Sequence, residues 1–309
     1  MNGAVRGAAC MCLCLLVLSG ATAPAPTHRE AGVLGGADGL QMRLPAALAM
    51  DAGGNVLIAD HGASAVLVVS PEGKVLNTIR LSFRPTAICA LADGRTYVGG
   101  RGVLIALDNT GRVANEARSE TLRDLPDAAV AGIAVDGKDV FVSFASTPGS
   151  TRGRIIRMDR ELKTARTIGT GYRGCCGILD IAARDGVLYL AENGTFRVIM
   201  FDRDGRELGH FGKRDAAAPD GFGGCCNPVN LCFGPDGALW TSEKTPNVVK
   251  RFDQKGRLLS VVSQLGRPAS REDLVGGCVS SSIAVSADCK TVYVLDKMTS
   301  SVRVLRRAE

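Results

Sequence analysis

Short apolar runs separated by turn-forming residues recur along the chain from residue 44 to residue 309. Each unit has a small or proline-led apolar run, an Asp-Gly-like turn, an apolar strand, a polar gap, another strand and another turn. The first turns are DAGGN at 51, ADGR at 92, VDGK at 135, RDGV at 184, PDGA at 235 and ADCK at 287. Glycine or aspartate between runs rich in β-branched residues is typical of β-hairpins, because these residues tolerate a positive φ.

The strands predicted after these turns are VLIAD, TYVGG, VFVSF, VLYLAE, ALWTSE and VYVLD. A second turn follows in five units, as PEGK at 71, NTGR at 109, DREL at 159, RDGR at 203 and QKGR at 254. Two hairpins give four strands per unit, and a period of about 40 to 54 residues fits the blade of a β-propeller. A TIM barrel would need a helix after each strand, and a sandwich of this length would need two domains and a linker.

The sixth unit ends one strand short, after SVRVLRR. Residues 31–43, AGVLGGADGLQMR, precede the first unit and belong to no other. If this stretch pairs as the outer strand of the last blade, the ring closes and an unpaired edge disappears. The sequence therefore predicts an all-β, six-bladed propeller over residues 31–309.

The clearest unit is PVNLCFGPDGALWTSEKTPNVVKRFDQKGRLL at 228–259. It resembles the NHL-repeat family of six-bladed propellers in the order of its proline, Asp-Gly turn, acid-terminated strand and Gly-Arg-Leu. Residues 55–76 and 187–208 match in the same way, so the resemblance covers nearly the whole mature chain. It implies the fold, and it implies that sites form near the axis where the chain enters each blade; it leaves the activity open.

The N-terminus has the features of a signal peptide. Arg6 is followed by an apolar run over 8–18 and by the small residues Ser19, Gly20 and Ala21. Cleavage is predicted after Ala21, which leaves a flexible segment at 22–30 and a secreted or periplasmic protein. The run is too short to cross a bilayer as a folded anchor, so we expect a mature chain without a transmembrane span. We also expect the protein to be a monomer.

The distribution of charged residues argues against a nucleic-acid partner. The 309 residues carry a formal net charge of +6, dispersed along the chain, with no basic run beyond Arg306-Arg307. Nucleic-acid-binding proteins concentrate their basic residues on one face or stretch. The sequence therefore predicts no nucleic-acid partner. A protein or small-molecule partner is expected separately, at the cysteine-bearing face of the propeller.

Cysteines are placed in register with the repeat. Signal cleavage would leave eight of the eleven cysteines. Pairs stand at the entries to the fourth and fifth units, and a single cysteine at the entry to the sixth: Cys175, Cys176, Cys225, Cys226 and Cys278. Four residues after the last cysteine of each entry comes a polar residue, Asp180, Asn230 or Ser282, where the first two units have Ala47 and Ala87.

Three interpretations of these five cysteines remain open. Thiolates converging near the axis suit a soft-metal or redox centre, with Cu, Zn or an iron-sulfur cluster as the candidate cofactor. Disulfides between blades, for example Cys176 with Cys226, would instead fasten the ring. Vicinal disulfides within each pair would form strained rings with a passive or ligand-holding role.

Acids end the second strand of four units, at Asp60, Glu192, Glu243 and Asp296. The family resemblance implies that these strand ends open onto the face that bears the cysteines, although acids in loops are also commonly just solvated. Glu192 and Glu243, with Asp180 and Asn230, are the candidate cofactor ligands.

Resemblance to other propellers bears on the activity. Lactonases of the senescence-marker type bind a divalent ion through acids and amides at the axis, which Glu243, Asn230 and Asp180 could imitate. The amidating lyases among NHL-like propellers use several axial histidines, and the three histidines of this chain cannot supply them. A non-catalytic propeller that binds a partner at the cysteine-bearing face is the remaining alternative.

The other cysteines and the tryptophan are predicted to be structural. Cys89 and Cys232 each lie four residues after a blade-opening proline, which favours packing as small hydrophobes. Cys289 replaces a turn glycine and is predicted to be exposed, and Trp240 is predicted to lie in the core.

Overall fold

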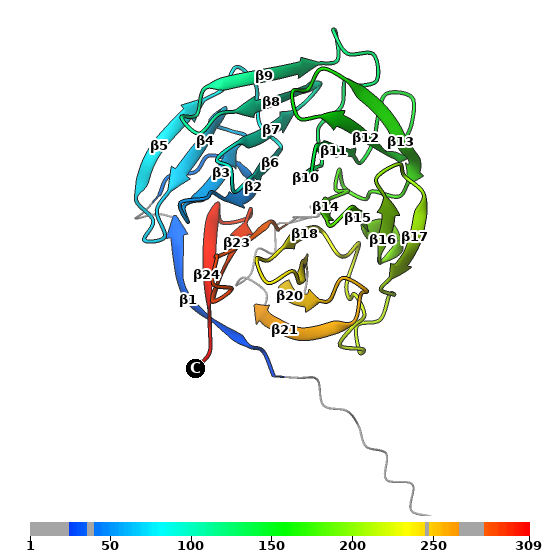
Figure 1. Ribbon diagram of the computed structural model, residues 1–309. Helices are drawn as coiled ribbons and strands as arrows, with labels where there is room; N and C mark the ends of the chain where they lie inside the picture. The colour runs from blue at the N-terminus through cyan, green and yellow to red at the C-terminus, as the bar shows by residue number, and fades with distance from the viewer. Residues whose placement is uncertain (1–24, 36–39, 245–246, 266–280) are drawn as a thin grey trace, which may run out of the picture.

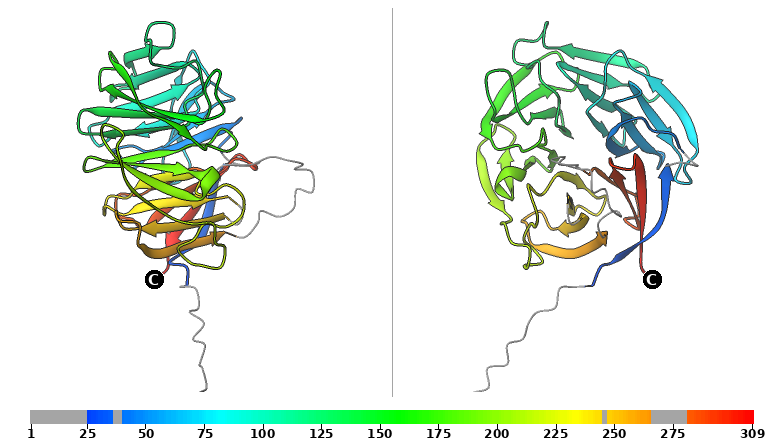
Figure 2. Two further views of the ribbon diagram at one scale, coloured as in Figure 1. Left: turned by 90° about the vertical axis from the view of Figure 1, so that its right-hand side faces the viewer. Right: turned by 180° about the vertical axis from the view of Figure 1, so that it is seen from behind.

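The computed structural model describes residues 25–35, 40–244, 247–265 and 281–309. Six four-stranded antiparallel sheets stand around a central axis like the blades of a wheel (Figure 1). The view along the rim shows that the blades form a single ring of stacked sheets (Figure 2). The predicted all-β, six-bladed propeller is confirmed.

The first three blades run from the axis outward in chain order. Blade 1 contains β2 (Pro45–Met50), β3 (Val56–Asp60), β4 (Ala65–Val69) and β5 (Val75–Arg80). Blade 2 contains β6 (Ala87–Ala90), β7 (Thr96–Gly100), β8 (Val103–Leu107) and β9 (Val113–Arg118). Blade 3 contains β10 (Gly132–Asp136), β11 (Asp139–Phe144), β12 (Gly153–Asp159) and β13 (Ala165–Tyr172).

Blades 4 and 5 repeat this order, and blade 6 takes its outer strand from the N-terminus. Blade 4 contains β14 (Ile181–Arg184), β15 (Val187–Glu192), the short 3-10 turn η1 (Asn193–Thr195), β16 (Arg197–Asp202) and β17 (Glu207–Phe211). Blade 5 contains β18 (Asn230–Phe233), β19 (Leu239–Glu243), β20 (Asn247–Phe252) and β21 (Leu258–Leu265). Blade 6 contains β22 (Ile283–Val285), β23 (Thr291–Asp296), β24 (Ser301–Arg307) and β1 (His28–Gly35).

The N-terminal strand closes the ring as predicted, but it spans His28–Gly35 instead of residues 31–43. β1 pairs antiparallel with β24, from His28 opposite Arg307 to Gly35 opposite Ser301. The strand ends at Gly35, whose φ of 88° breaks the extended backbone, and a Cβ there would lie 2.6 Å from Met42 Cε. An ion pair between Glu30 and Arg303 links the two strands at 2.6 Å.

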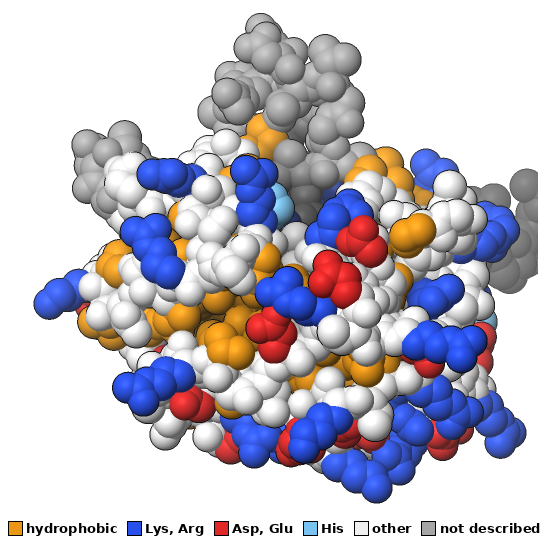
Figure 3. Space-filling model, turned by 90° about the horizontal axis from the view of Figure 1, so that it is seen from above, with side chains coloured by type: hydrophobic (Ala, Val, Ile, Leu, Met, Phe, Trp, Pro, Cys, Tyr) orange, Lys and Arg blue, Asp and Glu red, His pale blue; other side chains and the backbone are white. Residues whose placement is uncertain are grey.

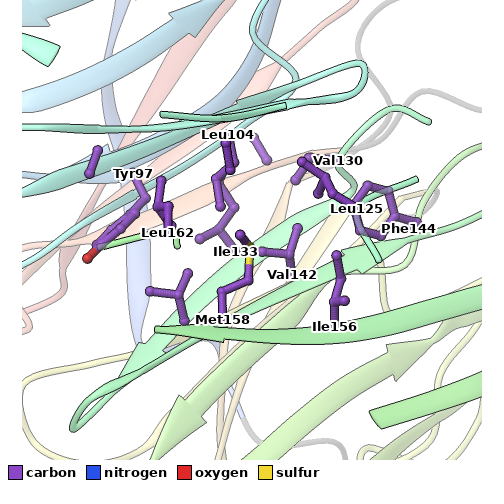
Figure 4. Packing of buried hydrophobic residues seen from close by; sticks show 14 of the residues in the cluster. Tyr97, Leu104, Leu125, Val130, Ile133, Val142, Phe144, Ile156, Met158 and Leu162 are labelled. Atoms are coloured by element: carbon purple, nitrogen blue, oxygen red, sulfur yellow. The ribbon is translucent and has the colours of Figure 1, made fainter. Parts of the chain in front are cut away.

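The hydrophobic core is divided among the interfaces between neighbouring blades, where six clusters of buried side chains lie. Figure 4 shows the cluster between blades 2 and 3, in which Tyr97 and Leu104 face Ile133, Val142 and Met158. Both faces of each blade are covered, which explains why second strands such as VLIAD are buried along their whole length and mainly apolar. Trp240 is 1% exposed in the cluster between blades 5 and 6, so its predicted core position is confirmed.

The rim is polar and mixed in charge. On the side of the wheel in Figure 3, basic and acidic side chains are interspersed with hydrophobic surface. Ion pairs join neighbouring blades, among them Arg160 with Asp93 at 2.7 Å and Arg157 with Asp204 at 2.6 Å. Exposed pairs of this kind contribute little stability, about 0 to 1 kcal/mol each, so the blades are held mainly by their buried faces.

Candidate functional site

The inner strands of the six blades line a cavity of about 500 Å³ on the axis. Cross-strand pairing and backbone hydrogen bonds place one residue of each blade at the same height on its wall: Ala47, Ala87, Gly132, Asp180, Asn230 and Ser282. Blades 1 to 3 therefore present a small, apolar wall, and blades 4 to 6 a polar one.

Each polar residue at this height reaches the inner strand of the next blade. The Leu231 N–H and Asn230 Nδ2 donate to Asp180 Oδ2 at 2.7 and 2.6 Å. Asn230 Oδ1 accepts from the Ile283 N–H at 2.8 Å, and Ser282 Oγ accepts from the Leu48 N–H at 3.0 Å. The polar wall is thus a chain of hydrogen bonds that joins blades 4, 5, 6 and 1 around the axis.

A carboxyl group and an amine are brought together in the cavity. Burial raises the pKa of Asp180 to about 7, against the opposing effects of hydrogen bonds from the Leu231 and Ile181 N–H groups and Asn230, and of the charge of Lys297. Burial lowers the pKa of Lys297 to about 8, and the charge of Asp180 opposes this shift. Both side chains line the cavity. Gly132 makes room for the carboxyl, since a Cβ there would lie 2.5 Å from Asp180 Oδ1.

The two double-cysteine turns have one local structure. Cys176 and Cys226 adopt left-handed backbone conformations, with φ of 58° and 57°, and these turn the chain sharply after the first cysteine. The vicinal sulfur atoms lie 3.3 Å apart in Cys175–Cys176 and 3.1 Å apart in Cys225–Cys226. The thiols of each pair therefore point to the same side of their turn.

A buried asparagine holds each turn. Asn193 Oδ1 accepts from the Cys175 N–H at 2.8 Å, and its Nδ2 donates to the Cys175 carbonyl at 3.3 Å. In blade 5, Asn227 Nδ2 donates to the carbonyls of Gly223 and Lys244 at 2.6 and 2.9 Å. Both asparagines are fully buried, so the turns are fixed on the rigid ends of blades 4 and 5.

The two turns meet. Burial, together with contacts from the thiols of Cys175 and Cys225, raises the pKa of Cys226. Cys176 also lines the axial cavity, so the two turns lie beside it. Within the described parts of the chain, no disulfide joins the seven cysteines, and no group of three or more His, Cys, Asp or Glu side chains is arranged to hold a metal ion. The predicted fifth member, Cys278, lies outside the described residues.

Glu192 and Glu243 lie outside the set of residues that line the cavity and bind their own loops. Glu192 accepts from the Arg173 N–H at 2.9 Å and from Arg197 Nε at 2.7 Å. Glu243 accepts from the Gly223 N–H at 2.9 Å and pairs with Lys250 at 2.6 Å. These contacts give both acids a structural role, and their role as cofactor ligands stays a prediction.

The same contacts shift the two acids in opposite directions. Burial opposes the charge of Glu192, but the hydrogen bonds from Thr195, the Arg173 N–H and Arg197 together hold its pKa below the ordinary value. Burial raises the pKa of Glu243, against the charge of Lys250. Asp60 has a similar anchoring role, since its carboxylate accepts from the N–H groups of the loop entering blade 1.

Sequence reasoning missed Lys297 and assigned two cysteines incompletely. Lys297 directly follows the strand-end acid Asp296, as Lys244 follows Glu243, so the repeat carried a signal for it.

Cys89 and Cys232 pack against core clusters as predicted, but they also line the cavity. Burial raises the pKa of Cys89 to about 12, so its thiol stays protonated. Cys289, predicted to be exposed, is half-buried in its turn with a φ of 57°.

Comparisons with known proteins identify the fold. No family model and no curated protein match the chain. A gluconolactonase from Xanthomonas campestris is similar in structure, with a TM-score of 0.63 and 14% identity over 93% of this chain and 97% of that one. A virginiamycin B lyase from Staphylococcus aureus gives a TM-score of 0.57 and 16% identity over 90% and 99%. A calcium-binding regucalcin from Agrobacterium tumefaciens gives 0.61 and 14% over 91% and 95%.

These neighbours are a lactonase, a lyase and a calcium-binding protein on one propeller fold, so the likeness establishes the architecture alone. The NHL-repeat assignment stays a prediction. Among the described residues, no helix has the length and apolar character needed to cross a bilayer.

Proposed function

We propose that the protein carries a dithiol–disulfide redox site in the two cysteine turns beside its axial cavity. The observation that supports this most directly is the pairing of vicinal sulfur atoms at 3.3 and 3.1 Å in two turns that meet. A disulfide bond is about 2.05 Å long, so each pair needs an approach of roughly 1 Å to close. The turns are anchored by Asn193 and Asn227, so this approach is local and does not disturb the blades.

The solvent exposure of the four thiols suggests the order in which they react. Cys176 and Cys225 are exposed, whereas their neighbours Cys175 and Cys226 are partly buried. An external disulfide is attacked by the exposed thiol, which forms a mixed disulfide and releases one thiol of the oxidant. The vicinal neighbour then attacks the mixed disulfide, closes the intramolecular bond and releases the second thiol. Each pair thus gives up two electrons and two protons, and the external disulfide takes both.

A metal centre fits the described residues less well. The described thiols do not form a group arranged to hold an ion. The two cysteine pairs are therefore assigned to thiol exchange rather than to Cu, Zn or an iron-sulfur cluster.

Export suits the proposed chemistry, because disulfides form and persist in oxidising compartments. The predicted signal peptide at 1–21 lies outside the described residues, so secretion to the periplasm or the exterior is part of the proposal. In this setting the site exchanges electrons with small or protein disulfides that reach the exposed thiols of Cys176 and Cys225.

A redox titration tests the function. The purified chain is equilibrated anaerobically in glutathione buffers of rising potential, and its free thiols are counted after quenching in acid. We expect four thiols to be lost and regained reversibly, and only two in Cys225→Ser/Cys226→Ser. Cys232→Ser is the matched control and should titrate like the wild type. Thiols that never oxidise, or metal bound stoichiometrically after anaerobic purification, would overturn the proposal.

Hydrolysis in the axial cavity is a second candidate, favoured by one observation. The structurally similar gluconolactonase shares the fold, and Asp180 and Asn230 are oxygen-bearing side chains on the polar wall of the cavity here. A panel of lactones assayed with Mg²⁺, Ca²⁺ or Zn²⁺ tests it, and activity should disappear in Asp180→Asn. Glu243→Ala is a poor test, since it breaks the ion pair with Lys250.

A further inference from the structure

The turn between β23 and β24 places the amine of Lys297 at the axial cavity. Lys297 follows the last residue of β23, and the Asp296 carboxylate accepts from the Met298 N–H at 2.9 Å, which fixes the turn. The side chain of Lys297 lines the cavity together with Asp180 of blade 4, and their charges interact. Lys138 and Lys213, by contrast, lie on the exposed surface.

The amine and the carboxyl group have complementary chemistry. Burial shifts the pKa of Lys297 down to about 8 and that of Asp180 up to about 7. An amine with a lowered pKa is partly neutral, and therefore nucleophilic, near neutral pH. A carboxyl group with a raised pKa is partly protonated and can act as a general acid. Hydrogen bonds from Asn230 and the Leu231 N–H hold Asp180 in place.

The rest of the cavity fits a small organic molecule. Its volume of about 500 Å³ falls within the range of ligand pockets, about 300 to 1,000 Å³. Opposite the polar wall, the inner strands of blades 1 to 3 contribute small apolar side chains such as Ala47, Ala87 and Ala134. A ligand can therefore place an apolar part on this wall and a polar group at Lys297.

We propose that the axial cavity binds a small carbonyl compound, an aldehyde or ketone, which Lys297 holds as an imine with Asp180 as the proton donor. The neutral Nζ attacks the carbonyl carbon, and the Asp180 proton passes to the carbonyl oxygen to give a carbinolamine. The carbinolamine then loses its hydroxyl group as water, and the nitrogen keeps one proton as an iminium. The sum is one carbonyl group, the neutral amine and the protonated Asp180 carboxyl group converted to one iminium group, one carboxylate and one water. This proposal does not depend on the thiol chemistry.

Reductive trapping tests the proposal with glyoxylate as the probe. The intact protein is incubated at pH 7 with glyoxylate and cyanoborohydride, which reduces an imine to a stable secondary amine, and labelled lysines are located by peptide mass spectrometry. At pH 7 an amine of pKa about 8 has roughly 200- to 300-fold more of its neutral form than an ordinary lysine. We expect Lys297 to be labelled at least about tenfold faster than Lys138 in the same sample.

Variants separate the two roles. Lys297→Arg should lose the fast label, while Lys138→Arg keeps it, and Asp180→Asn should slow labelling of Lys297 about tenfold or more. Circular dichroism checks that each variant folds. Because the wild-type comparison needs no variant, it decides the matter alone: labelling of Lys297 no faster than Lys138 would overturn the site. Unchanged labelling in folded Asp180→Asn would overturn the role of Asp180.

Discussion

Asn230 is the residue through which the polar wall is most directly tested, because its side chain joins three blades. Its Nδ2 donates to Asp180 in blade 4 at 2.6 Å, and its Oδ1 accepts from the Ile283 N–H in blade 6 at 2.8 Å. Asn230→Ala removes both bonds at once. A hydrogen bond to a charged group contributes about 1.5 to 3 kcal/mol, and one between neutral groups about 1 kcal/mol. Water in the channel replaces part of this, so we expect a loss of about 2 to 3 kcal/mol.

Chemical denaturation followed by tryptophan fluorescence measures this loss, because Trp240 is buried between blades 5 and 6. The control is Asn77→Ala, at an exposed site on β5, which should change the free energy of unfolding by less than about 0.5 kcal/mol. For a chain of this size the predicted loss lowers the melting temperature by about 4 °C. If Asn230→Ala is no more destabilising than Asn77→Ala, the bridging role of Asn230 is wrong.

Deletion of residues 28–35 should leave blade 6 with an unpaired edge, and size-exclusion chromatography should show aggregates that the full chain does not form. Glu243→Gln should cost about 3 kcal/mol in denaturant unfolding, because Lys250 is left as a buried unpaired charge. The raised pKa of Asp180 makes its contribution to stability fall as pH rises from about 4 to about 7, and Asp180→Asn should remove this slope in pH-dependent unfolding. The lowered pKa of Glu192 has the opposite sign: its contribution is present above about pH 4.3 and is lost as pH falls, and Glu192→Gln should flatten this acid limb.

The fold could be predicted because local patterns in each repeat, apolar runs bounded by Asp-Gly-like turns, mark the strands. VLIAD and TYVGG coincide with β3 and β7 residue for residue, since Asp-Gly-like turns bound a run that is buried on both faces. The closing strand was displaced to His28–Gly35 because its register depends on pairing with β24, at the opposite end of the chain. Such long-range pairing leaves no local signal.

The candidate site was predicted in part. The register of Asp180, Asn230 and Ser282 with the cysteines correctly indicated one height on the axial wall. The strand-end acids looked equivalent to these residues, but a sequence does not say whether a carboxylate faces the axis or turns back to its own loop. Glu243 turns back, because the Gly223 N–H and Lys250 both reach it.

The pairing of the cysteines after oxidation tests the central claim most directly. The oxidised chain is blocked at acidic pH, digested without reduction and mapped by mass spectrometry. The account predicts bonds within single peptides, Cys175 with Cys176 and Cys225 with Cys226, each reversed by mild reductant without loss of the fold. Bonds between the two turns, such as Cys175 with Cys226, that persist until the protein unfolds would contradict it and show that the cysteines fasten the blades.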